Sequence, residues 1–88
     1  MTANQSAIDV RISLYTDYLR KVYERFPDVR IDPTPEPFEW RVWLESIPKI
    51  LGLVSISWIE GRINNLDQAR TELCRQIDSL LRQNDIIP

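Results

Sequence analysis

The stretch FEWRVWLESIPKILGLVSISWIEG, residues 38–61, decides the fold. Apolar side chains occupy every second position over its first eight residues, at Phe38, Trp40, Val42 and Leu44, and a period of two is typical of a half-buried strand. The same alternation returns over 53–59, after a segment that contains Pro48 and Gly52. We therefore predict strands over 38–45 and 53–59 that pair as a hairpin. The side chains expected in the core are Phe38, Trp40, Val42, Leu44, Val54, Ile56 and Trp58.

Both flanks of this hairpin carry apolar residues at spacings of three and four, which indicates amphipathic helices. The first helix is predicted over 6–26, because Ser6 is a good N-cap and the residue before Pro27 avoids the α region. The second is predicted over 66–83, after the N-cap residue Asn65. Core positions on the two helices include Leu19, Val22, Leu73 and Ile77.

The segment between the first helix and the hairpin reads PDVRIDPTPEP, residues 27–37, and its four prolines exclude a helix. In this linker Val29 and Ile31 form either a short edge strand or single contacts with the core. The tail, residues 84–88, contains Ile86 and Ile87, which we expect to dock on the body or on a partner. The sequence thus predicts one α+β domain over 1–88, in the order α-β-β-α, with two helices packed on a small antiparallel sheet.

Composition limits the location and the partners of the chain. The 88 residues carry 11 basic and 13 acidic side chains, a net charge of −2, which disfavours non-specific attraction to nucleic acid. The N-terminus lacks the apolar core of a signal peptide, and no apolar run is long enough to span a bilayer. We therefore expect a cytoplasmic protein with no membrane partner.

The sequence offers little catalytic equipment. There is no histidine, which removes the commonest general base and the commonest zinc ligand. Two glycines cannot form a phosphate-cradling loop. The single cysteine, Cys74, lies on the apolar stripe of the second helix, where a thiol acts as a small hydrophobic group. We predict no catalytic, metal or cofactor site, and a protein that is not an enzyme.

The predicted partner-binding residues lie on the outer face of the sheet. If the even-numbered residues of the first strand face the core, Trp43 faces away from it, and Ile59 shares this outer face by alternation. An apolar centre with a charged rim is typical of a specific interface, and Trp is enriched at its energetic centre. The alternative is that Trp43 only packs across the strands on Ile59. The predicted binding residues are Trp43, Ile59, Arg41, Glu39 and Glu45.

These features predict a non-catalytic protein-binding module, such as an adaptor, an antitoxin or a phage-type inhibitor, that binds a target protein or a second copy of itself. The element order over about residues 8–82 also resembles the double-stranded-RNA-binding domain. That resemblance implies an alternative, RNA binding, which would use Arg11, Arg41, Arg62 and Arg70. In that family a lysine-rich cluster opens the last helix, whereas here residues 64–70 read NNLDQAR. The LDQAR and LLRQ segments also resemble the helical sequence that follows the strands in HicB-like antitoxins.

Overall fold

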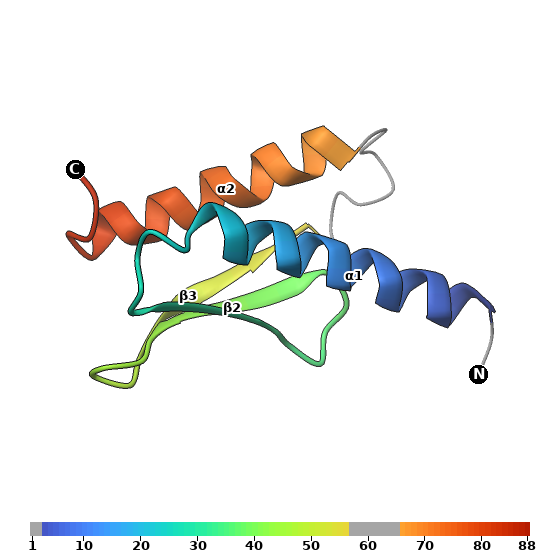
Figure 1. The fold of residues 1–88 in the computed structure, drawn as a ribbon, viewed down its shortest axis with the longest axis horizontal. Helices are drawn as coiled ribbons and strands as arrows, with labels where there is room; N and C mark the ends of the chain where they lie inside the picture. The colour runs from blue at the N-terminus through green and yellow to red at the C-terminus, as the bar shows by residue number, and fades with distance from the viewer. Residues whose placement is uncertain (1–2, 57–65) are drawn as a thin grey trace.

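The computed structural model of the protein describes residues 3–56 and 66–88. Three antiparallel strands form one sheet in the order β1-β2-β3, and both helices lie on the same side of it (Figure 1). The predicted α+β class is confirmed, and the short third strand is present as β1. The elements are α1 (Ala3–Val22), β1 (Val29–Pro33), β2 (Glu39–Leu44), β3 (Lys49–Ser55) and α2 (Leu66–Gln83).

The first helix begins and ends earlier than its apolar pattern predicts. Its last regular residue is Val22, and the chain then tightens into three-residue turns, in which the Phe26 N–H donates to the Tyr23 carbonyl at 3.0 Å. Such tightening is common where a proline follows. The turns bring the chain straight into β1, so the segment predicted as a linker over 27–37 contains a strand.

The two strands of the hairpin also differ from their predicted bounds. Phe38 has a positive φ of 58°, so extended structure in β2 begins only at Glu39. The β3 strand begins at Lys49, four residues before the predicted start at 53, because Lys49 and Ile50 already pair with Leu44 and Trp43. The predicted strand end, residues 57–59, lies outside the described residues.

The core fills the space between the sheet and the two helices. Trp40 is fully buried in the middle of it, and its ring meets the ring of Tyr15 edge to face at 6.0 Å between centroids. The core prediction is correct for Leu19, which is also fully buried, whereas Val22 is only half-buried. The buried apolar side chains are Tyr15, Leu19, Tyr23, Val29, Ile31, Phe38, Trp40, Val42, Val54, Ile56, Ala69, Leu73, Ile77 and Leu81.

The last helix approaches the sheet closely at one glycine. A Cβ atom on Gly52 would lie 2.7 Å from a terminal methyl carbon of Leu80, so the missing side chain lets α2 settle onto β3. After α2 the chain turns back at Asp85, which has a φ of 59°, and the Ile86 N–H donates to the Leu81 carbonyl at 2.9 Å. Ile86 and Ile87 then pack against the core, so the tail docks on the body of the protein.

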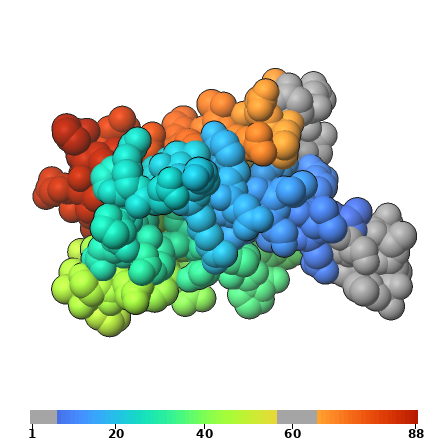
Figure 2. All heavy atoms as spheres, viewed as in Figure 1, coloured from blue at the N-terminus to red at the C-terminus, as the bar shows by residue number. Residues whose placement is uncertain are grey.

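The molecule is elongated, with extents of 40 × 24 × 20 Å. In the space-filling view the turn end of the β2–β3 hairpin, in yellow-green, projects at the lower left, below the two helices (Figure 2). Because both helices occupy one side of the sheet, the opposite side has no layer over it among the described residues (Figure 1).

Candidate functional site

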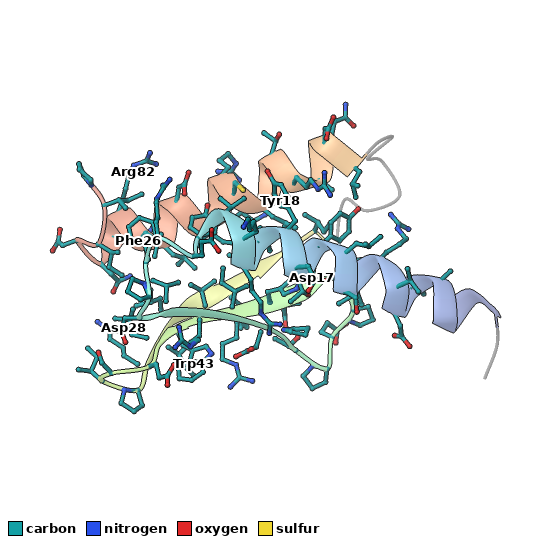
Figure 3. The ribbon with its side chains drawn as sticks, in the orientation of Figure 1. Asp17, Tyr18, Phe26, Asp28, Trp43 and Arg82 are labelled. Carbon is teal, nitrogen blue, oxygen red and sulfur yellow. The ribbon has the colours of Figure 1, made fainter. Side chains whose placement is uncertain are left out.

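The candidate site is this uncovered side of the sheet, here called the outer face. Directly paired residues of neighbouring strands share a face. Trp43 pairs with Arg30 on one side and with Ile50 on the other, and its side chain lies on the side of the sheet away from the helices (Figure 3). The prediction that Trp43 and Arg41 share a face opposite the core therefore agrees with the strand register. The paired residues on the outer face are Arg30, Asp32, Glu39, Arg41, Trp43, Ile50, Leu53 and Ser55, and Glu45 joins them through its ion pair with Arg30.

Trp43 is held by a charged chain of contacts across β1. Its indole N–H donates to Asp32 Oδ2 at 2.6 Å, and the other carboxylate oxygen of Asp32 accepts from Arg20 at 2.9 Å. The side chain is half-buried, so part of it remains accessible. This arrangement fixes the orientation of a large aromatic group, and a side chain fixed in this way loses less entropy when it enters a contact.

The charged rim is mostly paired. Arg30 forms an ion pair with Glu45, and Glu39 accepts a hydrogen bond from the Thr34 hydroxyl at 2.8 Å. The side chain of Arg41 is exposed and has no hydrogen-bond or ion-pair partner among residues 3–56 and 66–88. The outer face therefore presents one guanidinium group whose donors remain available, next to an aromatic ring on the same strand.

The apolar part of the outer face differs from the predicted one. Ile59, the predicted apolar neighbour of Trp43, lies outside the described residues. The structure instead pairs Trp43 with Ile50 and Arg41 with Leu53, whose exposed fractions are 61% and 57%. Sequence reasoning missed Ile50 because Leu51 is an extra residue in β3, and this bulge puts Ile50 out of phase with the residues that follow it. Leu53 lies beyond the bulge and alternates in phase with Ser55, so the pattern does place it on this face.

The strand edges, unlike the outer face, are partly closed to a second chain. On β1 the Arg20 Nε donates to the Ile31 carbonyl at 3.0 Å, and Pro33 has no N–H to offer. On β3 the Gln76 side chain bonds both the N–H and the carbonyl of Ser55, each at 2.9 Å. Side chains that occupy edge groups in this way oppose edge-to-edge pairing. The described edges therefore offer fewer free backbone groups than an open strand would.

The carboxylate of Asp28, which lies outside the outer face, binds the turn between β2 and β3. Asp28 accepts hydrogen bonds from the Ser46 N–H at 2.7 Å and from the Ser46 hydroxyl at 2.6 Å, and its own carbonyl accepts from the Glu45 N–H. These bonds with Ser46 favour the ionised form and lower the pKa of Asp28 below its usual range. Asp28 thus ties the β2–β3 turn to the start of β1.

We expect this contact to make stability depend on pH. Because the folded pKa of Asp28 is below the unfolded one, its contribution is fully present above the unfolded value of about 3.9 and is lost as pH falls through the folded pKa. Asp28→Asn should therefore lower the urea midpoint at neutral pH and differ less from wild type in acid. A difference between the two proteins that does not change with pH would contradict this assignment.

A second polar cluster links the residue that follows α1 to α2. The Tyr23 hydroxyl donates to Asp78 Oδ1 at 2.6 Å and lies 3.2 Å from the Cys74 carbonyl. Burial and the bond to Asp78 raise the pKa of Tyr23 well above its usual value. Cys74 is half-buried here, and desolvation raises the pKa of its thiol. The cluster ties the turn after α1 to α2 through a neutral hydroxyl.

Cys74 should accordingly react slowly in the folded protein. The raised pKa leaves little thiolate at neutral pH, and the half-buried side chain is only partly accessible to a reagent. We expect a thiol reagent to label Cys74 much more slowly in buffer than in denaturant. Equal labelling rates in the two conditions would mean that the thiol is fully accessible and that this face of α2 is misassigned.

The arginines of the RNA-binding alternative are spread over the molecule. Arg41 lies on the outer face, whereas Arg11 and Arg70 lie on the helices, which cover the opposite side of the sheet. Arg70 stacks on the Tyr18 ring at 4.4 Å, and Arg11 lies 5.3 Å from the Phe38 ring centroid. Arg62 lies outside the described residues. The described arginines therefore form no single basic surface.

Comparisons of the chain with models of known protein families, with curated proteins and with solved structures found no match in any of the three. Among the described residues no group of three acidic, cysteine or histidine side chains could hold a metal ion. No helix in the described part of the chain is long and apolar enough to cross a membrane.

Proposed function

We propose that this protein is a non-catalytic protein-binding module that acts through the outer face. The observation that carries the proposal is the position of Trp43, oriented by Asp32 and flanked by the exposed side chains of Ile50 and Leu53. Fixed aromatic groups beside apolar residues and a charged rim are characteristic of the energetic centre of protein interfaces.

The composition of the rim supports a protein partner. Its guanidinium and carboxylate groups alternate, so the face lacks the uniform positive potential that attracts a phosphate backbone. A partner surface with an apolar centre and at least one carboxylate near Arg41 would complete the contacts that the face leaves open. The adaptor, antitoxin and inhibitor roles all require such a surface, and all would use it without chemical catalysis.

Capture from a cell lysate on immobilised protein tests the proposal when two variants are compared. Trp43→Ala should reduce the amount of specifically retained protein at least tenfold, because a central aromatic anchor is lost. Leu14→Arg is the matched control, since Leu14 is half exposed on α1 and away from the outer face. Circular dichroism and urea unfolding should confirm that both variants remain folded.

Retention that is the same for wild type and for Trp43→Ala would contradict the proposal. A titration with double-stranded and single-stranded RNA at two salt concentrations supplies the other decisive result. Tight RNA binding that weakens steeply with salt would show that phosphate contacts, rather than the outer face and its apolar centre, carry the interaction.

A further inference from the structure

Two rows of side chains cross the outer face at right angles to the strands. The first row contains Arg30, Trp43 and Ile50, and the second row contains Asp32, Arg41 and Leu53. Each row contains one residue from each of the three strands, and the two rows lie next to each other on the face. Their chemistry differs in a regular way: the first row ends in a cation where the second ends in an anion.

These rows are complementary to each other when two sheets are stacked face to face. Consider a two-fold axis between the sheets, perpendicular to the strands and midway between the rows. It places the first row of one copy over the second row of the other, with Arg30 facing Asp32 of the second copy. Trp43 then faces the guanidinium of Arg41, a favourable cation–π arrangement, and Ile50 faces Leu53.

The charge of the outer face is compatible with such a contact. Arg20 and Arg30 are paired with Asp32 and Glu45 within one copy, which leaves Arg41 as the guanidinium group without a partner in the described part of the chain. The same axis places Glu45 of one copy opposite Glu39 of the other, a like-charge contact. Within its own copy Glu45 is ion-paired with Arg30 and Glu39 accepts from the Thr34 hydroxyl, which limits this repulsion. Stacked sheets lie about 10 Å apart, a separation that long side chains from both faces fill.

We infer that two copies of this chain pack outer face to outer face, with antiparallel β2 strands, to form a dimer with helices on both outer sides. This inference rests on the proposed function, because it names the protein partner of the same face as a second copy. The contact is isologous: each copy contributes both rows, so every pair of facing residues occurs twice.

Sedimentation equilibrium over a wide concentration range tests the dimer. Leu53→Arg should raise the dissociation constant at least tenfold, because it puts a second guanidinium beside Arg41 and opposite the apolar Ile50. Leu14→Arg should leave the constant unchanged, since Leu14 has a similar exposed fraction, 50% against 57%, but lies on α1. A dimer that Leu53→Arg weakens and Leu14→Arg does not would support the inference.

Two results would overturn it. One is a wild-type protein that stays monomeric at every concentration, and the other is a dimer that Leu53→Arg leaves intact. Lysate capture then separates the two proposals. If Trp43→Ala still abolishes retention of another protein, the outer face binds a partner other than a second copy. If it does not, the proposed function fails together with the dimer.

Discussion

Ile77→Ala is expected to lower the free energy of unfolding by about 2–5 kcal/mol, the range for removing a large aliphatic side chain from a packed core. Ile77 is fully buried on the side of α2 that faces the sheet. The cost combines the lost burial with the cavity that the surrounding side chains cannot fill. For a small domain whose total stability is about 5–15 kcal/mol, such a loss is a large share.

The matched control is Ile50→Ala, the same substitution at an isoleucine that is 61% exposed. Because Ile50 lies on the outer face, we expect its replacement to change the stability of the monomer by less than about 0.5 kcal/mol. Urea denaturation at low protein concentration measures both variants without a contribution from self-association. Equal losses in the two variants would show that the helices and the outer face are wrongly placed.

Thr16→Val is expected to cost about 1–3 kcal/mol, although the two side chains are nearly isosteric. The Thr16 hydroxyl is buried, donates to the Ile12 carbonyl at 2.7 Å and accepts from the Trp40 indole N–H at 2.8 Å. Valine fills the same space but leaves the indole N–H of a fully buried tryptophan without an acceptor.

Thr16→Ser separates the polar contribution from packing, because serine keeps the hydroxyl and loses only a methyl group. We expect it to retain more stability than Thr16→Val in thermal and urea unfolding. If serine destabilises the protein more than valine does, packing around Thr16 matters more than the bond to Trp40, and the assigned role of the hydroxyl is wrong.

The core could be predicted from the sequence because it depends on periodicity. The period of two in 38–45 places Trp40 and Val42 on one face of a strand, and the spacing of Leu73 and Ile77 places them on one side of a helix. All four are fully buried. In the structure the apolar face of the sheet packs against the apolar sides of the helices, and together they form one core.

The outer face could be predicted only in part. The alternation in β2 identified Trp43 and Arg41, but the bulge at Leu51 puts Ile50 out of phase with the rest of β3, so Ile50 was not recognised as the neighbour of Trp43. The contact of Asp32 with Trp43 joins residues from a segment predicted as a linker and a segment predicted as a strand. No local pattern reports such a pair, because it depends on how β1 aligns with β2.

The two indole groups near the centre of β2 offer the most direct test that the outer face is the binding surface. In a proton–nitrogen NMR spectrum, Trp43→Phe and Trp40→Phe would assign their N–H resonances. As protein concentration rises, or as a captured partner is added, we expect the Trp43 indole resonance to shift or broaden, because it lies on the outer face beside Asp32. The Trp40 resonance should stay in place, because that indole is buried against Thr16. If the Trp40 resonance moves while the Trp43 resonance stays fixed, the outer face is not the binding surface.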